Sequence, residues 1–127
     1  MEYLTAEEIL ILHALIIDET GGSHGMRDVG LLASIAKKPG LSFNGKELYE
    51  GVFTKAAVLL EAIANYHVFT GGNKRTALIT TARFLAMNGY DCTASNEDVE
   101  KTMVSVATKE IDVSEIAIWL EKNCRSI

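Results

Sequence analysis

One segment, from about Lys46 to Tyr66, constrains the fold more than any other part of the 127-residue chain. As a helix it would carry apolar side chains over most of its circumference, and such a helix has to be buried. A second apolar segment runs from about Asn73 to Asn88 and ends at Gly89, a residue type that often terminates helices. We therefore predict a core of two central helices. Their apolar residues are Val52, Phe53, Ala56, Ala57, Leu59, Leu60, Ile63 and Ala64, and Ala77, Leu78, Ala82, Phe84, Leu85 and Met87.

Shorter helices are predicted before and after this central pair. A capping box of Thr5 and Glu8 opens the first one, Asp28 caps the second, and Ser95 caps the helix that follows the central pair. A glycine-rich loop over residues 21–25 separates these two. The alternation that is typical of strands between hairpin turns is absent. The chain is thus predicted to be all-α, a compact bundle of six or so helices. The four shorter helices span about residues 5–18, 28–37, 96–108 and 113–123.

Length and composition fit a single domain over residues 1–127. With 48% hydrophobic residues the chain can form one core, but it is too short for two. A net charge of −5 argues against direct nucleic-acid binding through phosphate neutralisation. The most apolar run, residues 9–17, is too short to span a membrane, and the first residues lack the basic region of a signal peptide. We expect a soluble, cytoplasmic protein with reduced thiols at Cys92 and Cys124, and one disulfide stays open.

The stretch HVFTGGNKRTA, residues 67–77, separates the two central segments. It places two cations at a helix start, where they oppose the helix dipole. The first-turn N–H groups of a helix have no intrahelical partner and bind anions such as phosphate. Gly71 and Gly72 would let a ligand approach this backbone closely, and Lys74 and Arg75 would then face a phosphate. The alternative is a glycine turn between two core helices, with both cations simply solvated.

His67 would lie across the mouth of such an anion site, at the end of the preceding helix. An imidazole there can take a proton from an attacking hydroxyl, although it can also be a last-turn residue stabilised by the helix dipole. We predict Phe69 to be a core residue that fixes the loop, and His13 to be a core or groove histidine. His24 belongs either to a flap over the groove or to a solvated loop. Trp119 is predicted to be core, and no Cys/His cluster indicates a zinc site.

These residues resemble the signature of the Fic/Doc superfamily. Its pattern is a histidine, a phenylalanine two positions later, an acidic residue two after that, and then G/A-N-K/G-R. The match is closer to the Doc (death-on-curing) toxins than to Fic adenylyltransferases. Lys74 and Leu78 stand where Fic proteins have a second glycine and a second arginine. Further segments resemble the family in the right order, namely residues 4–13, 21–32, 83–89 and 107–111.

The resemblance implies the all-α Fic fold and an enzyme that binds ATP at the loop–helix junction. Such a toxin transfers the γ-phosphate of ATP to a threonine of elongation factor Tu and arrests translation, and a cognate antitoxin occupies its groove with a helical tail. By position, His67 becomes the general base and Arg75 a second catalytic residue. Asn73, Lys74 and Arg75 become phosphate and anion-hole residues, helped by the amides around Gly72. Lys74 favours phosphate transfer over AMP transfer.

One position departs from the family pattern. The acidic residue that binds Mg²⁺ falls at Gly71, and glycine supplies no side-chain oxygen. Because metal-bridged charge neutralisation is a large part of phosphoryl transfer, we expect weakened Mg²⁺ binding and slower chemistry. A degenerate member, a different metal arrangement and a chain altered to blunt a toxic activity all stay open. The alternative functions are a Fic-type adenylyltransferase, a catalytically weak antitoxin-binding member of the fold, or, more distantly, a generic interaction domain.

Overall fold

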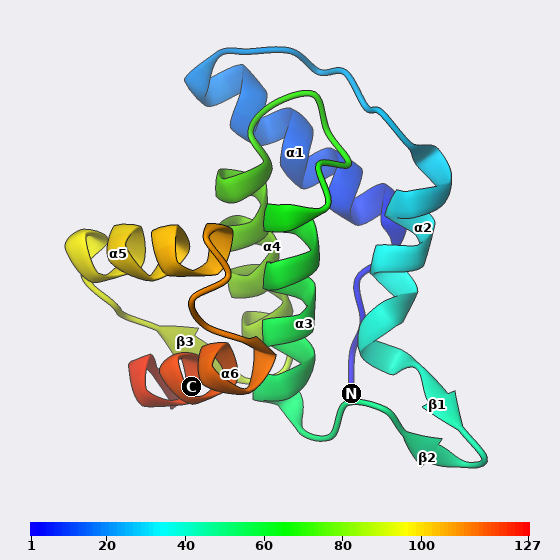
Figure 1. The fold of residues 1–127 in the computed structure, drawn as a ribbon, viewed down its shortest axis with the longest axis vertical. Coiled ribbons are helices and arrows are strands. Elements are labelled where there is room, and N and C mark those ends of the chain that lie inside the picture. Colours follow the sequence, from blue (N-terminus) through cyan, green and yellow to red (C-terminus); the bar gives the residue numbers. More distant parts are fainter.

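The two predicted central helices, α3 and α4, lie side by side in the middle of the molecule (Figure 1). The structure is a computed structural model that describes all residues, 1–127. α1 packs against α4, α6 packs against α3, and α2 and α5 lie on opposite sides of the central pair (Figure 1). The all-α prediction of about six helices is confirmed. The helices are α1 (Ala6–Thr20), α2 (Val29–Lys37), α3 (Val52–Asn65), α4 (Asn73–Met87), α5 (Asn96–Ala107) and α6 (Val113–Asn123), and α2 continues into a 3₁₀ turn, η1 (Lys38–Gly40).

Side-chain caps explain where four of these helices begin. The Thr5 hydroxyl accepts a hydrogen bond from the Glu8 amide, and the Glu8 carboxylate accepts one from the Thr5 amide. Each such cap replaces a missing intrahelical partner and stabilises the helix by about 1 kcal/mol. The predicted caps of α1, α2 and α5 are confirmed, and α6 has a capping box that the sequence analysis did not identify. The N-cap residues are Thr5, Asp28, Ser95 and Asp112.

The prediction that the first central helix begins near Lys46 is wrong. β1 (Ser42–Phe43) and β2 (Lys46–Glu47) form a small antiparallel hairpin there. Its turn, Asn44–Gly45, has φ values of 52° and 78°, which is the left-handed conformation that a two-residue hairpin turn requires. Gly51, with φ 83°, then directs the chain into α3. The Asn44–Gly45 turn precedes the predicted segment and Gly51 interrupts it, so the helix begins only at Val52. The Asn-Gly pair was the sequence signal for the turn.

A buried lysine on α3 holds this hairpin against the core. Lys55 is 1% exposed. Its ammonium group donates a hydrogen bond of 2.8 Å to the Pro39 carbonyl and lies 3.4 Å from a carboxylate oxygen of Glu47. A buried charge needs such partners to offset its desolvation. Lys55 therefore connects η1 and β2 to the central helix.

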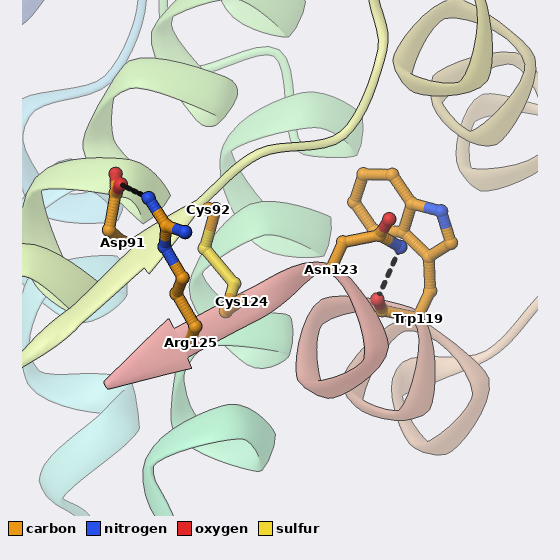
Figure 2. The surroundings of a disulfide bond; sticks show 6 residues. All are labelled: Asp91, Cys92, Trp119, Asn123, Cys124 and Arg125. Atoms are coloured by element: carbon orange, nitrogen blue, oxygen red, sulfur yellow. Dashed lines mark hydrogen bonds and ion pairs between the residues drawn. A yellow bond between two sulfur atoms is a disulfide. The ribbon is translucent and has the colours of Figure 1, made fainter. Parts of the chain in front are cut away.

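The expectation of reduced thiols is also wrong for this structure. β3 (Tyr90–Cys92) pairs with β4 (Cys124–Ser126), so that Cys92 lies directly opposite Cys124, and a disulfide joins the two (Figure 2). Facing residues of an antiparallel pair lie close enough for this bond. The cysteines are 32 residues apart in sequence, and nothing in their spacing revealed that they face each other.

The core is continuous across the central helices and the segments around them. It contains 20 buried apolar residues, and half of them come from α3 and α4. Trp119 packs partly buried against this cluster, and its indole N–H donates to the Asp98 carboxylate. Neither α1 nor any other helix combines the length and the apolar character that crossing a bilayer requires.

Candidate functional site

The loop between α3 and α4 lies at the upper end of the molecule, beside the loop that follows α1 (Figure 1). Backbone hydrogen bonds join the two loops. The Arg27 amide donates to the Val68 carbonyl at 2.8 Å, and the Thr70 amide donates to the Gly25 carbonyl at 2.9 Å. These bonds hold the α3–α4 loop in one position over the ends of the central helices.

Phe69 and Asn73 shape the turn that leads into α4. Phe69 is completely buried, which confirms its predicted place in the core. Its amide donates to the side-chain oxygen of Asn73, and the side-chain nitrogen of Asn73 donates to its carbonyl, at 3.1 and 3.0 Å. The Asn73 side chain therefore closes the turn. Its second amide hydrogen and its backbone N–H have no acceptor in the protein.

The start of α4 has no side-chain cap. Its N-cap is Gly72, in the left-handed conformation with φ 74°. The first hydrogen bond runs from the Thr76 amide to the Gly72 carbonyl, and the backbone amides of residues 71–75 donate to no protein acceptor. A Cβ atom at Gly72 would lie 3.1 Å from a methyl group of Ile17, so both the backbone conformation and the available space favour glycine here.

A cavity of 360 Å³ opens at this turn. All five residues that the sequence analysis selected line it: His67, Gly72, Asn73, Lys74 and Arg75, together with Ala64. Lys74 and Arg75 are exposed, and neither forms an ion pair with a carboxylate of the protein. Free amide hydrogens and unpaired cations on one concave surface can bind an anion.

His67 lies beyond the end of the helix, not in its last turn. α3 ends at Asn65, Tyr66 is the C-cap, and His67 has φ 54°. A left-handed residue other than glycine is uncommon and often marks a functional position. The exposed imidazole makes no hydrogen bond within the protein, and it lines the same cavity as Lys74 and Arg75. His67 directly follows the C-cap, where a left-handed residue commonly ends a helix, so the alternative of a residue stabilised by the helix dipole stays open.

A hydrogen bond from Lys38 holds the side chain of Tyr66, the residue before His67. The Lys38 ammonium group donates a hydrogen bond of 2.7 Å to the Tyr66 hydroxyl. Partial burial acts to lower the pKa of Lys38, but this hydrogen bond and the negative potential of Tyr66, Tyr49 and Glu61 outweigh it, so the pKa is raised. The pair fixes the C-cap of α3 and with it the point where the chain turns toward the cavity.

The remaining histidines divide between core and surface. His13 is 1% exposed, stacks on Phe69 and contacts the Gly71 carbonyl, so the core alternative is confirmed. Its contact with the turn was not predicted from the sequence. The spacing of four between Ile9, His13 and Ile17 was a signal that it faces inward. His24 is exposed and lies 2.8 Å from the Asp18 carboxylate.

The side chains at the cavity do not fit a Mg²⁺ ion held by protein carboxylates. The structure contains no group of three or more His, Cys, Asp or Glu residues that could hold a metal. Gly71 offers no side-chain oxygen, and the hard Mg²⁺ ion requires oxygen ligands. The donors that are present, amides and cations, suit the anion itself.

Comparison with known proteins agrees with this geometry. Residues 3–85 match the model of the Fic/DOC family, and this range includes the cavity. The chain is 35% identical over 122 residues to the Toxin Doc of Mycolicibacterium smegmatis, which covers 94% of this chain and 91% of that protein. It is also 35% identical over 122 residues to the Protein kinase doc of Escherichia phage P1, covering 96% and 95% of the two chains.

Proposed function

This chain belongs to the Fic/DOC family, and from that premise we propose that it is the toxin of a toxin–antitoxin pair and a phosphotransferase. The proposed reaction moves the γ-phosphate of ATP to a threonine hydroxyl of elongation factor Tu, which arrests translation. One observation carries the proposal: an exposed imidazole shares a cavity with unpartnered helix-start amides and two free cations. The proposed antitoxin is a second protein that covers this cavity with a helical tail.

The phosphate chain of ATP is proposed to bind at the start of α4. The amides of Gly72, Asn73 and Lys74 would donate to its oxygens, since they have no acceptor in the protein. Lys74 and Arg75 supply positive charge, and the planar guanidinium group of Arg75 can donate two parallel hydrogen bonds. The resemblance implies that Lys74 replaces a glycine that leaves room for the tail phosphates in AMP transfer, and this favours transfer of the terminal phosphate.

His67 is proposed to act as the general base. Its imidazole takes the proton of the threonine hydroxyl while the oxygen forms a bond to the γ-phosphorus. The bond between that phosphorus and the bridging oxygen of the β-phosphate breaks, and ADP leaves. Arg75 stabilises the negative charge on the transferred group. We assign no step to Mg²⁺, because no carboxylate side chain lines the cavity.

Gly71 favours a second candidate function, a weak enzyme that acts mainly by binding its antitoxin. The missing carboxylate removes the protein ligand that the family pattern places there. The position can accept a side chain, because an added Cβ atom meets nothing within 4 Å and φ is not in the left-handed region. Gly71→Asp is therefore a substitution that the fold tolerates, and it separates the two functions.

The decisive experiment measures label transfer to purified elongation factor Tu from ATP labelled at the γ- or the α-phosphate. We expect label from the γ-position only, and we expect Gly71→Asp to raise the rate by a factor of about 10²–10³. Gly71→Asn is the matched control, since it has the same shape without the charge. Label from the α-position only would identify an adenylyltransferase. An absence of label and of growth inhibition in Gly71→Asp, with antitoxin binding retained, would leave the binding function.

A further inference from the structure

His13 is a buried polar residue on the inward face of α1, and the proposed reaction gives it no role. A buried polar group is costly unless it is hydrogen-bonded. Nε2 of the imidazole lies 2.9 Å from the carbonyl oxygen of Gly71, 58 residues further along the chain. Because a carbonyl oxygen only accepts, Nε2 carries the proton and donates this bond.

The ring of His13 is also held flat against Phe69. The two ring centroids are 3.8 Å apart, and the planes differ by 5°. Phe69 is itself fixed, since it is fully buried and its backbone is bonded to the Asn73 side chain. Stacking sets the plane of the imidazole and the hydrogen bond sets its rotation. His13 therefore connects α1 to the middle of the turn.

This connection determines the direction of the peptide group between Gly71 and Gly72. A trans peptide is planar, so its C=O and N–H point in opposite directions, and the chain contains no cis peptide. The Gly71 oxygen points at His13 in the interior, and the Gly72 N–H therefore points away from α1. That N–H has no protein acceptor, and Gly72 lines the cavity that His13 does not reach.

We propose that His13 is a positioning residue, which aims the Gly72 amide at the phosphate by holding the Gly71 carbonyl. The inference rests on the proposed function, since it names the group that sets the geometry of that phosphate site. Two adjacent glycines can rotate their shared peptide group at little cost. A turn of this composition therefore needs an external partner, and α1 supplies it.

A matched pair of variants, His13→Gln and His13→Met, tests the proposal. The two side chains have similar length and neither has a ring, but only glutamine can donate to the Gly71 carbonyl. We would measure the affinity for ATP and for inorganic phosphate, and the ¹H–¹⁵N resonance of the Gly72 amide. We expect the Met variant to bind both probes about tenfold more weakly than the Gln variant. Its Gly72 resonance should also move further from the wild-type position.

Equal affinities and equal Gly72 resonances in the two variants would overturn the proposal. If the Met variant does not fold, His13→Phe replaces it, because phenylalanine keeps the stack on Phe69 and removes only the donor. If the wild-type chain binds neither ATP nor phosphate, the proposed function fails. The Gly72 resonance still decides the role of His13 in that case: a difference between the variants supports it, and identical resonances refute it.

Discussion

The two ends of α4 are built in opposite ways. At its C-terminal end, the side chain of Asn88 makes three hydrogen bonds, two with the backbone of Glu2 and one with the Phe84 carbonyl. Gly89 donates to Ala86 and accepts from Ile127. At its N-terminal end, by contrast, the amides of residues 71–75 have no protein acceptor and two cations have no counter-ion.

This contrast separates residues that stabilise the fold from residues that we propose to bind a ligand. The C-terminal end is further joined to the rest of the chain by the β3–β4 pair and its disulfide (Figure 2). The N-terminal end leaves polar groups and charges unsatisfied that a bound anion would satisfy. Substitutions at the C-terminal end of α4 should therefore lower the free energy of unfolding. Substitutions at its N-terminal end should instead weaken ATP binding or slow phosphate transfer.

The largest expected effect is the loss of transfer in His67→Asn. Removing a general base costs about 10²–10⁴-fold in rate. Asparagine tolerates the left-handed conformation, and the exposed imidazole has no hydrogen bond to lose, so the unfolding temperature should stay unchanged. Label transfer from γ-labelled ATP and thermal unfolding are measured side by side. His24→Asn, in the neighbouring loop, is the control, and a His67 variant that keeps wild-type turnover would refute the assignment.

Next in size is the effect of removing the disulfide at the opposite end of α4. Cys92 and Cys124 close a loop of 32 residues, for which the chain-entropy estimate is about 4 kcal/mol of stability. The double variant Cys92→Ser/Cys124→Ser should lose about that much in urea unfolding, whereas its ATP affinity at low denaturant should equal that of the wild type. Loss of ATP affinity in the folded variant would contradict the separation of the two ends.

Two glycines allow a smaller and more direct comparison. Gly72 and Gly89 both have positive φ values, 74° and 94°, so alanine at either position should cost about 1–2 kcal/mol in unfolding. Only Gly72→Ala also places a Cβ near Ile17 and disturbs the amides at the cavity. We expect weaker ATP binding in that variant alone. Gly71→Ala is the neutral control, and reduced binding in Gly89→Ala would break the comparison.

How far the sequence could predict this structure differs between its helices and its turns. Capping residues and apolar periodicity are local signals, so the helices that begin at Thr5, Asp28 and Ser95 were predicted within a few residues. The start of α3 was missed because apolar periodicity outweighed the Asn44–Gly45 turn signal. The disulfide was missed because strand register depends on contacts across the fold, which a spacing of 32 residues does not encode.

At the cavity, too, local sequence signals predicted some features, and features that depend on the folded structure were missed. The unusual composition around Gly72 indicated an anion site, and the residues selected for it do line one cavity. The left-handed backbone of His67, the turn closure by Asn73 and the contact of His13 with Gly71 were not predicted. The first depends on a single backbone angle, and the other two depend on contacts that form only when the chain has folded. Local chemistry located the site, and tertiary packing determines its geometry.

The smallest expected effect concerns the Lys38–Tyr66 hydrogen bond, next to the cavity residue His67. Tyr66→Phe removes the hydrogen bond that helps to raise the pKa of Lys38, so that pKa should fall, which an NMR titration of the ammonium group measures. A pKa raised by folding adds stability below the unfolded value and loses it as pH rises through the folded value. Tyr66→Phe should therefore be less stable at neutral pH, by under about 1 kcal/mol for so exposed a pair, and the difference should vanish at strongly alkaline pH. In a Lys38→Met background the substitution should have no such effect, and a loss that persists at high pH would show that Tyr66 acts through packing instead.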